Sequence, residues 1–155
     1  MLFNSNLVAY GRSADLSGDT ILIGAPHFNL GEGAVFLYDW TGTNWTLAQS
    51  FGPPATVSQT NTHFGESVAL DGDVAIVGMP GYTLNDRGTA FAYRRQPGGW
   101  TQDGPRFETS ELDEFHLLGQ DVALEEDTAL VWAEGIRTIY AFERAPGGWE
   151  ETGKL

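Results

Sequence analysis

The sequence predicts an all-β fold made of three tandem copies of one unit. Three segments align without a gap, and the offset between them is constant (64 − 10 = 54 and 118 − 64 = 54). Self-similarity at a fixed period is the sequence signature of a repeat architecture. No segment shows a sustained 3.6-residue hydrophobic period, so no helix is predicted. The aligned segments are residues 10–26, 64–80 and 118–134.

The middle repeat shows the elements of the unit most clearly. Asp71-Gly72-Asp73 predicts a tight hairpin, and Pro97-Gly98-Gly99 predicts a turn that needs positive φ. Residues 74–77 form a continuous apolar run, typical of a strand buried on both faces, whereas residues 89–94 alternate as in a half-buried strand. The predicted strands are residues 67–70, 74–77, 89–94 and a last strand that begins at Trp100. Four antiparallel strands in roughly 50 residues indicate a propeller-type blade.

Short motifs at the ends of the aligned segments carry a family resemblance. Phe64-Gly65 and Gly78-Met79-Pro80 resemble the FG-GAP repeat, the unit of the integrin α-subunit propeller and of many bacterial surface proteins. Repeat 1 is similar, with Tyr10-Gly11 and Gly24-Ala25-Pro26. Repeat 3 departs from the pattern, because Trp132-Ala133-Glu134 stands where Gly-x-Pro belongs, so Trp132 either caps the array or shapes an interface. The resemblance implies a non-catalytic interaction module that is secreted or exposed on the cell surface.

The whole chain reads as a single repeat domain, with repeats at about residues 3–51, 52–107 and 108–155. Propellers have roughly four to eight blades, so three blades do not close a ring. Two chains supply six blades, which predicts a C2 homodimer that forms a six-bladed propeller. The alternatives are further blades of a longer chain, an unclosed arc, or another β-assembly.

Charge and composition exclude several classes of partner. The chain has 21 Asp and Glu residues against 8 Lys and Arg, a formal charge of −13, so a nucleic-acid partner and an anionic membrane surface are both disfavoured. No apolar run approaches the roughly 18 residues of a membrane helix, so no membrane insertion is expected. The first residues lack the basic and apolar regions of a signal peptide. The chain has no cysteine, which excludes disulfides and thiolate chemistry.

The candidate metal ligands of the chain all have a simpler structural role as the alternative. Integrin-type FG-GAP blades often carry a calcium loop rich in aspartate, but the hairpins at 17–19, 71–73 and 125–127 hold too few carboxylates for a calcium cage. The sequence therefore predicts no calcium site and no cofactor. His63 and His116 occupy comparable connections between repeats, where they either share a metal or proton role or are solvated. An acidic run (Glu108, Glu111, Asp113 and Glu114) is either a paired-carboxylate site or a solvated loop.

Ligands of propellers tend to bind at one mouth of the central channel, which the resemblance also implies for this chain. Residues that differ between repeats in the loops at this mouth are the predicted ligand-binding residues: Tyr82, Asn85, Asp86, Arg87, Glu134 and Arg137. The leading function is a protein-interaction or assembly module. The alternatives are a carbohydrate-binding propeller, in which recurring tryptophans (Trp45, Trp100 and Trp149) stack on sugars, and an enzyme with a site at the channel mouth.

Overall fold

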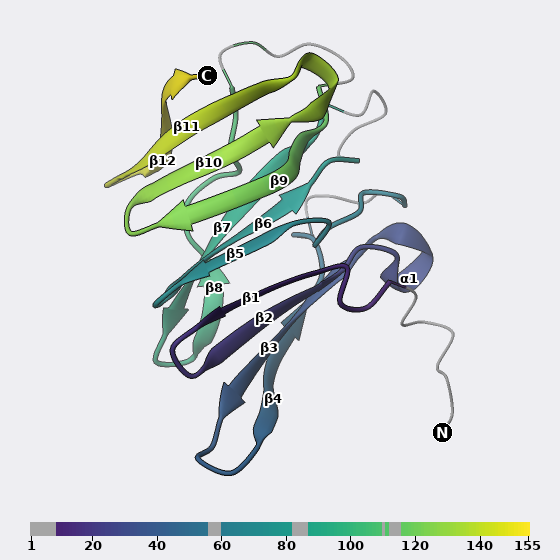
Figure 1. The fold of residues 1–155 in the computed structure, drawn as a ribbon, viewed down its shortest axis with the longest axis vertical. Coiled ribbons are helices and arrows are strands. Elements are labelled where there is room, and N and C mark those ends of the chain that lie inside the picture. Colours follow the sequence, from purple (N-terminus) through teal and green to yellow (C-terminus); the bar gives the residue numbers. More distant parts are fainter. Residues whose placement is uncertain (1–8, 56–59, 82–86, 110, 112–115) are drawn as a thin grey trace.

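A computed structural model describes residues 9–55, 60–81, 87–109, 111 and 116–155, and it consists of three four-stranded antiparallel sheets (Figure 1). Each sheet is built from four strands that are consecutive in the chain. Sheet 1 contains β1 (Ser13–Ser17), β2 (Thr20–Ala25), β3 (Ala34–Trp40) and β4 (Trp45–Phe51). Sheet 2 contains β5 (Val68–Asp71), β6 (Val74–Met79), β7 (Thr89–Gln96) and β8 (Gly99–Gln102). Sheet 3 contains β9 (Leu118–Glu125), β10 (Thr128–Ala133), β11 (Thr138–Ala145) and β12 (Gly148–Lys154).

The all-β prediction is confirmed, and the third repeat forms a full sheet despite its altered motif. Helical turns in the described residues are limited to α1 (Phe28–Gly31) and the 3₁₀ turn η1 (Glu134–Ile136). Asn29 and Leu30 within α1 have φ of 50° and 61°, so α1 is a left-handed loop and not a regular helix. In the described part of the chain, neither helical segment has the length or the apolarity to cross a membrane.

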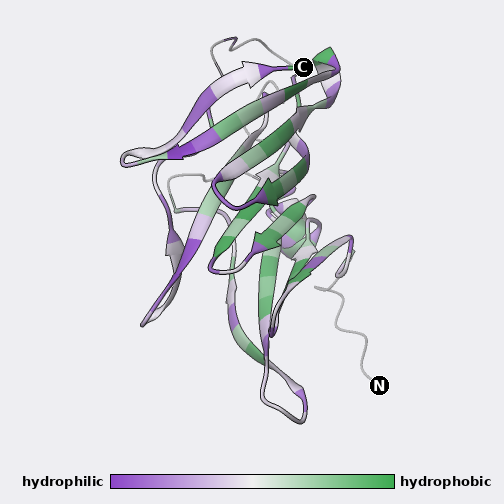
Figure 2. Ribbon diagram, turned by 60° about the vertical axis from the view of Figure 1, so that its left-hand side comes forward, coloured by the Kyte–Doolittle hydropathy of each residue, from purple (hydrophilic) through white to green (hydrophobic). Residues whose placement is uncertain are grey.

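The sheets stack face to face in chain order, so sheet 2 lies between sheets 1 and 3 (Figure 1). The front face of sheet 2 is the face that contacts sheet 1, and its rear face is the face that contacts sheet 3. The front and rear faces of sheets 1 and 3 point in the same two directions. Every residue of β6 is buried, because both faces of this strand are covered, as its continuous apolar sequence predicts. Hydrophobic residues accordingly concentrate in the middle of the stack, whereas the hairpin ends are more hydrophilic (Figure 2).

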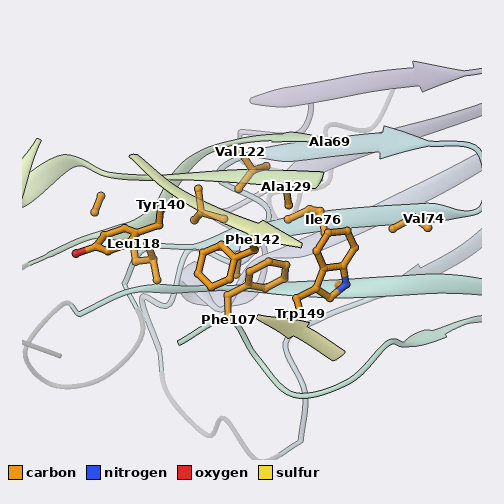
Figure 3. Packing of buried hydrophobic residues seen from close by; sticks show 14 residues of the cluster. Ala69, Val74, Ile76, Phe107, Leu118, Val122, Ala129, Tyr140, Phe142 and Trp149 are labelled. Atoms are coloured by element: carbon orange, nitrogen blue, oxygen red, sulfur yellow. The ribbon is translucent and has the colours of Figure 1, made fainter. Parts of the chain in front are cut away.

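The first core lies between the rear face of sheet 1 and the front face of sheet 2. Leu22, Val35 and Leu37 come from sheet 1 and are fully buried. They pack against the front face of sheet 2, where strand alternation places Leu70, Ala75, Val77, Met79, Phe91, Tyr93 and Trp100. The second core lies between sheets 2 and 3, where the Phe107 ring lies between those of Phe142 and Trp149 at centroid distances of 4.7 and 5.6 Å (Figure 3).

The first core makes stability depend on pH in the alkaline range through Tyr93. Burial raises the pKa of the Tyr93 phenol above its ordinary value of about 10. Above pH 10 the unfolded chain therefore loses this proton before the folded chain does, and the unfolding free energy falls as pH rises, by up to about 1.4 kcal/mol per pH unit for this group. We expect Tyr93→Phe to show a shallower loss than wild type between pH 9.5 and 11 in urea unfolding; identical slopes would contradict this assignment.

Candidate interaction surfaces

The two internal joints between sheets share a serine and a glycine that fit the next sheet. The Ser13 hydroxyl donates to the Gly65 carbonyl at 2.9 Å, and the Ser67 hydroxyl donates to the Gly119 carbonyl at 2.8 Å. A Cβ atom on Gly78 would lie 2.1 Å from the Gly119 carbonyl oxygen, closer than any atom can approach. Gly24 stands in the same column, 54 residues earlier, and a Cβ there would lie equally close to the Gly65 carbonyl.

A second glycine column completes each joint. Gly33 forms an isolated parallel bridge with Phe64, and Gly88 forms the equivalent bridge with Leu118. Both glycines have positive φ, and a Cβ on either would lie within 2.2 Å of a backbone oxygen of the next sheet. A joint therefore consists of three residues on the earlier sheet, a serine and two glycines, that admit the backbone of the later sheet.

The rear face of sheet 3 lacks all three joint residues. Asp121 stands in the serine column, Trp132 in the first glycine column and Arg137 in the second. Arg137 keeps a left-handed backbone, with φ of 54°, but it adds a long charged side chain. Because the joints leave no room even for a Cβ atom, the rear face of sheet 3 does not accept another sheet in the way that sheets 1 and 2 do. This observation favours the capping role that the sequence offered for Trp132.

The front face of sheet 1 is exposed, although its residues match those that form a core elsewhere. Leu16 is 59% exposed, whereas Leu70, in the same column of sheet 2, is 5% exposed beneath sheet 1. Trp45 and Trp100 show the same contrast, at 39% and 5%. The large apolar residues exposed on β1, β3, β4 and the turn before β1 are Tyr10, Leu16, Trp40, Trp45 and Leu47. Exposed apolar clusters of this kind are typical of surfaces that contact other proteins.

An arginine column also distinguishes the internal joints from this exposed face. Arg95 of sheet 2 donates to the Asp39 carboxylate of sheet 1 at 2.8 Å and lies over the Trp100 ring, 5.2 Å from its centroid. Arg144 of sheet 3 donates in the same way to Asp103, which follows β8, at 3.1 Å. Trp40 occupies this column in sheet 1, five residues before the recurring tryptophan, and its ring packs against Trp45 at 5.4 Å. The front face of sheet 1 therefore presents two indoles in contact, with their planes tilted by 53°, where the internal joints present a cation.

A groove at one end of the inner strands contains one of the predicted ligand-binding residues. Glu134 lines it together with residues in or next to β1, β5 and β9, among them Arg12, Glu66 and Asp121. Arg87 and Arg137 are described but are not among its lining residues. Tyr82, Asn85 and Asp86 lie outside the described residues. The sequence does hold a signal for Arg12 and Glu66, two groove residues that the prediction missed. Their repeat column differs from copy to copy, with Arg12, Glu66 and Gln120 in repeats 1, 2 and 3.

Carboxylates of the inner strands and of the acidic run make defined structural contacts. The hairpin residue Asp71 accepts the Glu126 amide of the next sheet at 2.7 Å, which accounts for an acid in this turn. Glu108 pairs with Arg106 at 2.6 Å, and Glu111 pairs with Lys154, which holds the pKa of Glu111 below its ordinary value. Asp113 and Glu114, the other members of the acidic run, lie outside the described residues.

The comparisons with known proteins agree with the repeat motif. Comparison with curated proteins gives no significant match. The family model of the FG-GAP repeat matches residues 55–93, a segment that contains β5, β6 and most of β7. This segment includes Gly78 and Gly88, the two glycines of the second joint. The resemblance inferred from Phe64-Gly65 and Gly78-Met79-Pro80 is therefore confirmed for residues 55–93.

Proposed function

We propose that this chain is a non-catalytic assembly module made of three propeller blades, in which the front face of blade 1 packs against the rear face of another blade. Blades 1, 2 and 3 are the sheets described above. The observation that carries the proposal is the column comparison between Leu16 and Leu70. The leucine in this column is buried in blade 2, which blade 1 precedes. It is exposed in blade 1, which no blade of the described chain precedes.

The nature of the partner follows from what the internal joints require. The front face of blade 1 retains the turn glycine, Gly11, with φ of 82°, and the Gly11 amide donates to the Gly24 carbonyl at 3.0 Å. Gly65, in the same column, has φ of 88° and makes the equivalent bond to Gly78 at 3.0 Å. The turn that the later blade brings to a joint is therefore retained in blade 1, although Trp40 replaces the arginine of the internal joints. A blade that carries the serine and the two glycines on its rear face has the matching shape.

A second copy of this chain is the other candidate partner. A six-bladed C2 homodimer, as the repeat count predicts, would place the Gly11 carbonyl of one copy against Trp132 of the other. The internal joints tolerate no side chain at that position. We therefore favour a blade from a longer chain or from a different protein, and the homodimer requires a joint of a different kind.

The carbohydrate-binding alternative receives less support from the tryptophans. Stacking on sugars in each blade needs the recurring tryptophans at the surface. Trp100 and Trp149 are 5% and 7% exposed, because they pack between blades. A secreted or cell-surface location remains an expectation that comes from the family.

The solution mass of the wild-type chain tests which partner the face accepts. The proposal expects a monomer of 16.8 kDa by light scattering after size exclusion, at low micromolar concentration. A mass twice this value in wild type, returning to the monomer in Leu16→Glu, would show that blade 3 accepts blade 1 without the joint residues. That result would overturn the partner proposed here in favour of the homodimer.

A further inference from the structure

Three potential metal ligands meet at the joint between blades 1 and 2. One ligand atom from each of His27, His63 and Glu66 lies within 4.8 Å of the other two. The two imidazole rings are 5.2 Å apart between centroids, with an interplanar angle of 67°. His27 is exposed, and the other two residues are half-buried. We propose that this cluster binds a divalent transition-metal ion of the zinc class.

The donor set determines the class of metal. Two imidazole nitrogens and one carboxylate oxygen, with a fourth position open to water, form a common set of protein ligands for zinc. Calcium and magnesium prefer sites made of oxygen ligands. Bonds of about 2.0–2.1 Å around a tetrahedral ion place its ligand atoms roughly 3.3 Å apart. The three side chains therefore need only a small closing movement, which the exposed His27 side chain is free to make.

The backbone holds two of the ligands in place. The His63 amide donates to the Gly31 carbonyl at 3.0 Å, and the His63 carbonyl accepts the Glu66 amide at 3.0 Å. One turn therefore presents both side chains, immediately before β5. His27 follows β2 of the preceding blade and supplies the third ligand from the other side of the joint. A bound ion would accordingly link blade 1 to blade 2.

The cluster is a departure from the repeat and not a product of it. The positions equivalent to His27, His63 and Glu66 at the joint between blades 2 and 3 are Gly81, Leu117 and Gln120, 54 residues later in each case. None of these three has a ligand side chain of the zinc class. His116, which the sequence places in a connection comparable to that of His63, is buried and stands in the column of Thr62, one position before that of His63.

Arg12 forms an ion pair with the carboxylate of this cluster. Its guanidinium group lies 3.0 Å from the Glu66 carboxylate, and the Arg12 side chain is 57% exposed while that of Glu66 is 10% exposed. A cation bound by Glu66 must displace this ion pair or tolerate a positive charge beside it. Removal of the Arg12 charge is therefore expected to strengthen metal binding. If Glu66 served only to pair with Arg12, the same substitution would not produce tighter binding of a metal ion.

Calorimetric titration of the tag-free chain with zinc chloride tests the proposal. We expect one zinc ion per chain, with affinity reduced at least tenfold in His27→Ala and in His63→Asn, where asparagine tolerates the left-handed backbone at this position. Arg12→Gln should raise the affinity several-fold. His116→Gln, which leaves the cluster intact, is the matched control and should bind as wild type does.

Thermal unfolding supplies a second readout that does not depend on the heat of binding. Zinc at a hundred times its Kd should raise the melting temperature of wild type and of His116→Gln, because it binds the folded state. His27→Ala should melt normally without zinc and gain little from it. Equal zinc binding by wild type and His27→Ala, or no binding by wild type, would overturn the proposal.

Discussion

Gly78→Ala is expected to lower the free energy of unfolding by about 3 kcal/mol, although alanine is ordinarily the better residue within a strand. The added methyl group would lie 2.1 Å from the Gly119 carbonyl oxygen and 2.2 Å from the Ser67 hydroxyl. Both atoms belong to the joint between blades 2 and 3, and one is backbone that moves only with its strand. Blade 3 must therefore shift, which opens the second core at the packing of Phe107.

Gly98→Ala is the matched control for this variant. Gly98 lies in the turn between β7 and β8, and a Cβ atom there meets no atom within 4 Å. Its effect on the unfolding free energy should be within about 0.5 kcal/mol in urea titrations. Equal effects of the two alanines would contradict the view that the glycine column exists to admit the next blade.

Leu70→Ala and Leu16→Ala, two identical changes in one repeat column, are expected to differ by at least 2 kcal/mol. Leu70 is buried between blades 1 and 2, so its truncation leaves a cavity and should cost about 2–5 kcal/mol. Leu16 is 59% exposed on the open front face, and its truncation should change stability by about 0.5 kcal/mol or less.

Urea unfolding of both leucine variants against wild type gives the comparison. The midpoint and the slope should be fitted together, because a change in slope would indicate an altered unfolded state. A large loss in Leu16→Ala would contradict an open front face and would mean that a second copy or another part of the chain covers it.

The strands were predictable because their signals are local. Gly72 between two aspartates marks the hairpin that joins β5 to β6, and the continuous apolar run of β6 requires burial on both faces. These properties depend on a few neighbouring residues and on backbone conformation. The repeat then extends the prediction from the clear middle copy to repeat 3, whose motif is altered.

The contacts between blades were not predictable in the same way. The sequence shows that Trp132 breaks a glycine column, but it does not show that the column lies against the carbonyl of the next blade. Similarly, His27 and His63 meet because the end of β2 packs against the connection that precedes β5. The stacking of the sheets sets the distance between the two histidine rings. Among the predicted ligand residues that the structure describes (Arg87, Glu134 and Arg137), Glu134 alone lines the groove at the inner strands.

The most direct test of the central claim restores the joint on blade 3. The triple variant Asp121→Ser, Trp132→Gly, Arg137→Gly gives the rear face of blade 3 the residues that receive a blade elsewhere in the chain. Circular dichroism and thermal unfolding first establish that the variant folds, since a glycine within β10 costs up to about 1 kcal/mol. Light scattering should then show twice the monomer mass of 16.8 kDa, as blade 1 of each copy packs on blade 3 of the other, with the monomer restored by Leu16→Glu. A folded triple variant that remains monomeric at high micromolar concentration would contradict the claim that these three residues decide whether a blade is accepted.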